Sequence, residues 1–109
     1  MDIDFKKVHE EAHEKIHKAL TLFLLKNGDY HGACGFAWVK VLGVRKNSKL
    51  GKQLIELGFY KSDYEKALVL WNPGGLSTQC VETKCVAASA YAETLRSHGL
   101  VAYAQSRLD

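Results

Sequence analysis

The sequence contains few of the features that define several large classes of protein. Its 109 residues include three cysteines, one proline and no internal repeat. Three cysteines are too few, and odd in number, for a disulfide framework, so a reducing cytoplasm is the expected compartment. The longest apolar run, residues 19–25, is well short of the roughly 20 residues that a membrane helix needs. Because it follows a charged amphipathic segment, neither a membrane span nor a signal peptide is expected.

Signatures of catalysis and of cofactor binding are also scarce. The segment "GACG", residues 32–35, lacks the spacing and the following helix of a phosphate-binding loop. Nucleophilic catalysis needs a thiol or hydroxyl beside a base, and the one local pair is His31 with Cys34. A small enzyme built on these two residues stays as an alternative. No cofactor is expected.

The first thirty residues carry histidines at a spacing that can serve metals. Three of them lie four residues apart and share one ridge of the expected helix: His9, His13 and His17. Two imidazoles at this spacing can bind zinc, but no cysteine pair with ligand spacing accompanies them. The ridge adjoins the apolar stripe of the helix, where half-exposed residues usually lie. We therefore expect no metal site.

Acidic residues are missing from one stretch of the chain. The formal net charge is +3, yet residues 1–29 and residues 56–109 each carry one more acid than base. Residues 30–55 hold no acid and five bases: Lys40, Arg45, Lys46, Lys49 and Lys52. A local excess of positive charge concentrates anions, so the segment 40–52 is a candidate surface for a phosphate-bearing partner. The alternative is a solvated, lysine-rich loop.

Hydrophobic periodicity indicates alternating helices and strands. Apolar residues recur with the helical period over residues 4–26, and shorter helices are expected over 49–57 and from Ser77 or Thr78 to residue 98. Apolar strands are expected over residues 33–42, 66–71 and 100–108. The predicted fold is one α+β or small α/β domain over residues 1–109, with a three-stranded sheet packed by three helices in the order αβαβαβ. Residues 1–28 would form an amphipathic N-terminal helix and residues 33–109 the core.

The strand "ACGFAWVKV", residues 33–41, is apolar on both faces. Side chains alternate along a strand, so a half-buried strand would show polar residues on one face. We therefore expect a central strand that helices cover on one side, and a further helix or a second subunit on the other. Since the long helices and strands are also more apolar than a three-stranded sheet can bury, a homo-oligomer is predicted.

Flat rings and bases occur together in the predicted core segments. A protein that stacks a nucleobase and holds its phosphate needs this combination. The candidate ligand-binding residues are Trp38, Lys40, Arg45, Lys49, Tyr64, Trp71, Arg107 and Asp109. Arg107 can hold a phosphate with two parallel hydrogen bonds; alternatively it pairs with Asp109 and anchors the end of the chain.

Several motifs resemble a family of small proteins encoded by tailed bacteriophages. They are the strand "CGFAWV", the helix opening Ser48-Lys49, the spacing of Tyr64 and Trp71, an alanine-rich helix, and the ending "LRSHGLVAYAQSRLD". The resemblance spans residues 33–109. Relatives have a Lys-Glu pair where this chain keeps Lys84 and carries Cys85, so a role for that acid does not carry over.

The resemblance implies a phage accessory protein acting in the cytoplasm of the infected bacterium. Together with the basic segment and the tryptophans, it leads us to expect a protein that counters host immunity by binding and sequestering a phosphate-bearing nucleotide signal. A nucleic-acid-binding or protein-binding inhibitor that uses the segment 40–52 is the main alternative. The two differ in salt dependence, because binding to a nucleic-acid backbone weakens steeply as salt rises.

Overall fold

Helices and strands alternate along the chain much as the periodicity predicts. The computed structural model describes residues 4–27, 33–62, 67–76, 78 and 80–108. The elements are α1 (Phe5–Asn27), β1 (Gly35–Leu42), α2 (Lys49–Glu56), β2 (Tyr60–Lys61), β3 (Ala67–Trp71), α3 (Val81–Ser97) and β4 (Val101–Leu108). The α+β class is confirmed. The described sheet has four strands instead of the expected three, because the two-residue β2 is too short to leave a periodic signal.

The four strands form one antiparallel sheet in the order β2-β3-β1-β4. From β1 onward the chain runs β-α-β-β-α-β, and with this strand order it has the split βαβ, or ferredoxin-like, topology. The central strand is β1, which pairs with β3 from Trp38 to Leu42 and with β4 from Gly35 to Leu42. The helix α1 precedes this unit.

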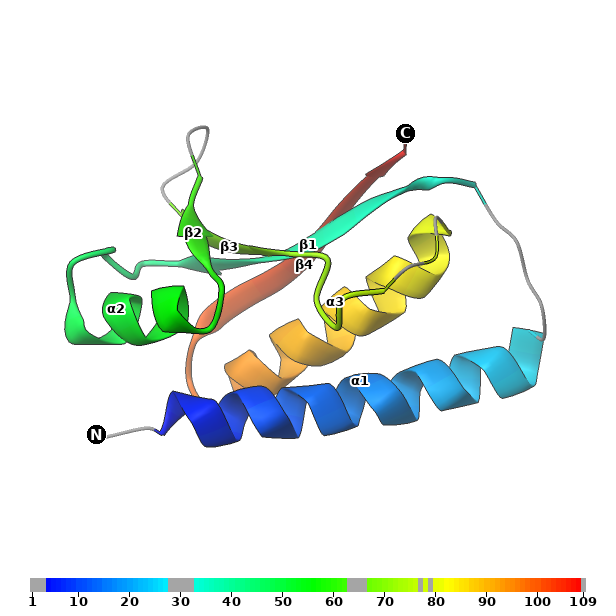
Figure 1. Cartoon of the computed structure of the whole chain (residues 1–109), viewed down its shortest axis with the longest axis horizontal. Coiled ribbons are helices and arrows are strands. Elements are labelled where there is room, and N and C mark those ends of the chain that lie inside the picture. The colour runs from blue at the N-terminus through cyan, green and yellow to red at the C-terminus, as the bar shows by residue number, and fades with distance from the viewer. Residues whose placement is uncertain (1–3, 28–32, 63–66, 77, 79, 109) are drawn as a thin grey trace.

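The long helices are stacked on one side of the sheet (Figure 1). Helix α3 packs against β1 and β4, and α1 packs against α3. Small side chains allow this close stacking, and Ala87, Ala88 and Ala92 are fully buried. Beneath α3 the sheet contributes Val39 and Val41, also fully buried, each worth about 1.5–3 kcal/mol relative to an exposed side chain. Thus α3 is the middle layer.

The arrangement corrects one expectation about β1. Its burial alternates, with Ala37, Val39 and Val41 buried under α3 and the residues between them only half-buried. A helix was expected as one possible cover for the second face, but α1 and α3 lie on the same side (Figure 1). The long N-terminal helix instead uses its apolar stripe on α3, which leaves the other face of the sheet without it.

The apolar stripe of α1 is buried where the periodicity places it. Phe5, Val8, Ala12 and Ile16 are at most 5% exposed. Nearer the end of the helix, Leu22, Leu24 and Leu25 are 68%, 53% and 79% exposed. The last turns of α1 therefore leave these leucines largely uncovered. No helix in the described ranges is long and apolar enough to cross a membrane.

Two helix starts show how local chemistry sets the boundaries. Ser48 caps α2, since its hydroxyl oxygen accepts the Gly51 N–H at 3.0 Å. The third helix was expected to open at Ser77 or Thr78, which is wrong: α3 begins at Val81 with Cys80 as its N-cap. Thr78 instead accepts the Cys80 N–H on its side-chain oxygen at 3.1 Å, which extends the turn before the helix.

Candidate functional site

The face of the sheet turned away from α3 is rich in aromatic residues. Residues that are paired across neighbouring strands have their side chains on the same face of the sheet. The strand register therefore identifies the residues of this face, starting from β1. We call it the open face; its larger members are Phe36, Trp38, Lys40, Leu42, Tyr60, Val69, Trp71, Val101, Tyr103, Gln105 and Arg107, of which Val69 is buried. Tyr60, Trp71, Val101 and Tyr103 are 42–49% exposed. Among the described strand residues of this face, none is acidic.

Two tryptophans form the centre of the open face. Trp38 on β1 lies directly opposite Trp71 on β3, and their rings are stacked with centroids 5.3 Å apart and 11° between the planes. Phe36 extends the row, since its centroid is 5.5 Å from that of Trp71. Offset stacking at these distances is favourable for aromatic pairs, so the rings hold one another in place.

Two cations flank the phenylalanine that ends this row. The Arg107 guanidinium carbon lies 5.3 Å from the Phe36 ring centroid, and the Lys84 ammonium lies 5.2 Å from it. Lys84 reaches the sheet from α3, is only 6% exposed, and donates a hydrogen bond to the Gly35 carbonyl at 3.0 Å. Arg107, in contrast, is exposed on β4. The row therefore ends in positive charge that a ligand can reach.

The close approach of α3 to this end of β1 depends on a glycine. A Cβ atom at Gly35 would lie 2.8 Å from the Val81 Cβ and 2.5 Å from the Arg107 carbonyl oxygen. Neither neighbour can move without shifting a helix or a strand. The Cys-Gly-Phe sequence thus permits the contact between the sheet and the first turn of α3.

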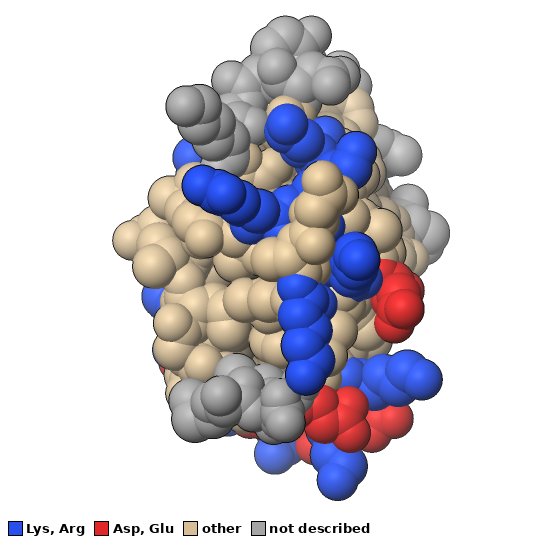
Figure 2. All heavy atoms as spheres, turned by 90° about the vertical axis from the view of Figure 1, so that its left-hand side faces the viewer, with Lys and Arg blue, Asp and Glu red and all other residues tan. Residues whose placement is uncertain are grey.

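A basic cavity lies at the end of the molecule formed by the β1–α2 loop and β2. Its volume is about 650 Å³, and it is lined by Gly43, Val44, Arg45, Lys46, Asn47, Lys61, Ala67 and Leu68. Lys61 comes from outside the basic segment of the sequence and adds a third cation. Figure 2 shows Lys and Arg side chains gathered on this end of the molecule, with acidic residues along the lower right edge of the view. The cavity can attract a phosphate group.

The structure divides the candidate residues between these two places. Trp38, Lys40, Trp71 and Arg107 share the open face, whereas Arg45 lines the basic cavity, whose lining does not include the tryptophans. Lys49 is the exposed first residue of α2. Tyr64 and Asp109 lie outside the described residues. Sequence reasoning missed Phe36 and Lys61 as site residues; the alternation of β1 could have indicated Phe36, but only the pairing of β2 with β3 brings Lys61 to the cavity.

The histidines of α1 face α3 at one point. The His9 Nδ1 lies 2.7 Å from the hydroxyl of the fully buried Tyr91, and its ring centroid lies 4.3 Å from that of His13. Burial, and secondly the neighbouring His13, lower the pKa of His9. Within the described ranges, no group of three or more His, Cys, Asp or Glu residues is placed to hold a metal ion.

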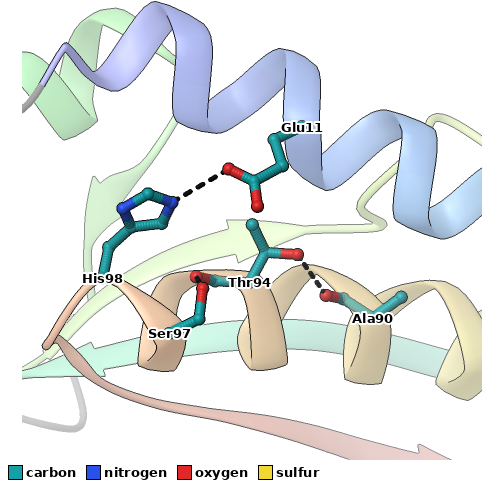
Figure 3. Close-up of polar contacts among 5 residues, drawn as sticks. All are labelled: Glu11, Ala90, Thr94, Ser97 and His98. Carbon is teal, nitrogen blue, oxygen red and sulfur yellow. Dashed lines mark hydrogen bonds and ion pairs between the residues drawn. The ribbon is translucent and has the colours of Figure 1, made fainter.

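A second polar contact ties α1 to the end of α3. His98 Nε2 and Glu11 Oε2 are 2.9 Å apart, across the two helices (Figure 3). Within α3 itself, the Thr94 and Ser97 hydroxyls donate to the carbonyls of Ala90 and Thr94, respectively. Polar contacts thus accompany the apolar contact between the helices, and we find no reactive constellation there.

The structure describes no base beside Cys34 that would support the catalytic alternative. Cys34 is exposed just before β1, and the His31 proposed as its base lies outside the described residues. No protein-family model matches this chain, and no curated protein or solved structure is detectably similar to it. The open face and the basic cavity are therefore the two candidate binding surfaces of the described residues.

Proposed function

We propose that this protein binds single-stranded nucleic acid by stacking unpaired bases on the open face of its sheet. The observation that carries the proposal is the stacked pair Trp38–Trp71 on a sheet face that α1 and α3 leave uncovered. Every nucleobase has a flat π face, and stacking on an aromatic side chain contributes about 1–3 kcal/mol per base. A row of three rings offers more than one such position.

The surroundings of the rings suit a phosphate backbone. Lys40 is on the same face as Trp38, and the exposed Arg107 lies at the end of the row beside Phe36. Arg45 and Lys46 lie in the loop beyond the C-terminal end of β1, whereas Lys61 pairs with Leu68 and so belongs to the other face of the sheet. A single nucleic-acid strand lying along β1 would therefore stack its bases on the aromatic rings in the middle. Its phosphates would contact positively charged side chains at both ends.

The four-stranded sheet with aromatic residues on one face supports nucleic-acid binding by analogy. RNA-recognition motifs stack two or three bases on aromatic side chains of a four-stranded sheet. The two share only the four-stranded sheet and aromatic side chains on it, so the proposal depends on the residues of this site and not on the fold.

The test measures binding of fluorescein-labelled oligo(dT) and oligo(U), about 12 nucleotides long, by fluorescence anisotropy. Trp71→Ala should weaken binding by tenfold or more, because one stacking position is lost. Arg107→Ala should weaken it and lower the slope of log affinity against log salt by about one. Lys26→Ala, which removes an exposed cation at the end of α1, is the matched control and should change neither.

Two results would contradict the proposal. One is an affinity unchanged within twofold in Trp71→Ala. The other is equal loss in Lys26→Ala and Arg107→Ala, which would indicate attraction to net charge without a site.

A second candidate function is the capture of a small phosphate-bearing nucleotide. The resemblance to phage proteins suggests such a function, in which the protein sequesters a nucleotide signal of host immunity. The basic cavity favours it, because about 650 Å³ is within the usual range for small-molecule sites. Calorimetric titration with cyclic dinucleotides separates the two functions. Salt-tolerant binding lost in Lys61→Ala and retained in Trp71→Ala would favour the second candidate.

A further inference from the structure

Two cysteines that are far apart in the sequence lie opposite each other in the fold. Cys34, just before β1, and Cys80, just before α3, form an isolated antiparallel bridge. The Val81 N–H donates to the Ala33 carbonyl at 2.9 Å, whereas the Cys80 N–H donates to the Thr78 side chain. The hydrogen bond thus joins the neighbours of the two cysteines, so Cys34 and Cys80 are a non-hydrogen-bonded pair.

This kind of pair has the backbone spacing of a disulfide. In a non-hydrogen-bonded antiparallel pair the Cα atoms are about 4.5 Å apart, with the side chains on the same face. Disulfides span Cα distances of about 4.4–6.8 Å. We propose that Cys34 and Cys80 form a site of reversible disulfide modification, independent of the proposed nucleic-acid binding.

The two thiols differ in the way that an exchange reaction requires. Both are reduced in the structure; Cys34 is exposed, whereas Cys80 is 5% exposed. An oxidant can therefore reach Cys34 first. Cys80, the N-cap of α3, lies directly opposite Cys34, so it is placed for the second attack.

The oxidant is a small-molecule disulfide such as oxidised glutathione. The Cys34 thiolate attacks one sulfur of that disulfide and releases one glutathione thiolate, which leaves a mixed disulfide on Cys34. The Cys80 thiolate then attacks the Cys34 sulfur and releases the second glutathione. The two cysteine protons end on the two glutathione thiols, and the protein loses two electrons, which the glutathione disulfide gains.

Oxidation would join the start of β1 to the first turn of α3. The bond closes a long loop, from residue 34 to residue 80, that contains β1, α2, β2 and β3. Closing a loop of this length restricts the unfolded chain and raises the melting temperature, by about 5 °C or more in a domain of this size. The bridge already pairs the two residues in a backbone arrangement that a disulfide can span.

The experiment incubates the full chain in equal concentrations of reduced and oxidised glutathione, and then alkylates the remaining thiols and maps peptides by mass spectrometry. We expect a peptide linked through Cys34 and Cys80, one alkylated thiol at Cys85, and the higher melting temperature. Cys85→Ser is the matched control and should behave as the parent. Cys34→Ser and Cys80→Ser should show neither the linked peptide nor the temperature shift.

Other products would overturn the proposal. They are a glutathione adduct that persists on Cys34 while Cys80 is alkylated only after unfolding, a link through Cys85, or a dimer joined through Cys34. Since the parent alone distinguishes these products from the expected one, the test does not depend on the folding of any variant.

Discussion

Replacing Lys84 by methionine tests whether the buried ammonium under the open face stabilises the fold. The side chain is 6% exposed, and its ammonium donates to the Gly35 carbonyl at 3.0 Å beside the Phe36 ring. Methionine keeps most of the apolar stem but leaves that carbonyl without its donor, which costs about 1–3 kcal/mol. The lost cation–π contact adds about 1 kcal/mol. Relief from burying a charged group offsets part of this loss.

The net expectation for Lys84→Met is a loss of about 1–2 kcal/mol in the free energy of unfolding, or about 5–10 °C in melting temperature. Urea denaturation followed by far-UV circular dichroism measures it, with an unchanged slope showing that two-state unfolding persists. Lys52→Met, at an exposed position of α2, is the control and should stay within about 0.5 kcal/mol of the parent. If Lys84→Met is as stable as the parent or more so, the hydrogen bond to Gly35 is no net stabiliser and this reasoning is refuted.

Two further predictions concern acid stability and assembly. Burial and the neighbouring His13 lower the pKa of His9 below its ordinary value of 6.5, so the unfolded chain takes up a proton at a pH where the folded chain does not. The free energy of unfolding should therefore be retained above about pH 6.5 and fall as the pH drops below it, and it should fall less steeply in His9→Gln; identical pH profiles would contradict this. The expected homo-oligomer has an exposed apolar surface available at the end of α1, where Leu25 is 79% exposed. Sedimentation at micromolar concentration should show an oligomer that Leu25→Glu weakens, and a parent sedimenting only as the 12.2 kDa chain would refute it.

The elements with strong local signals could be predicted from the sequence. The stripe from Phe5 to Ile16 fixes the buried face of α1, and the Ser48 cap fixes the start of α2, because both signals depend only on near neighbours. The expected end of the third helix at residue 98 is within one residue of the observed end at Ser97, and Gly99, with a φ of +91°, follows it.

What the sequence could not supply is the pairing between distant segments. Nothing local indicates that Trp38 lies opposite Trp71, or that Cys34 lies opposite Cys80, because strand order and register arise from the whole fold. The same holds for Lys61, which joins the cavity only through the two-residue β2. The composition suggested a stacking and phosphate-binding surface, but its division into an open face and a separate cavity required the structure.

The position of Trp38 on the central strand has a consequence for the entropy of binding. β1 is hydrogen-bonded along both edges, and Trp38 is stacked against Trp71, so the backbone and the rings of the platform are ordered before any ligand arrives. A ligand that stacks there immobilises few protein side chains, each of which would otherwise cost about 0.5–1.5 kcal/mol. Arg107, exposed on the edge strand β4, would give up more of its rotamer freedom if it bound a phosphate as proposed. The tryptophans are thus the preorganised part of the surface, and the arginine is its adaptable part.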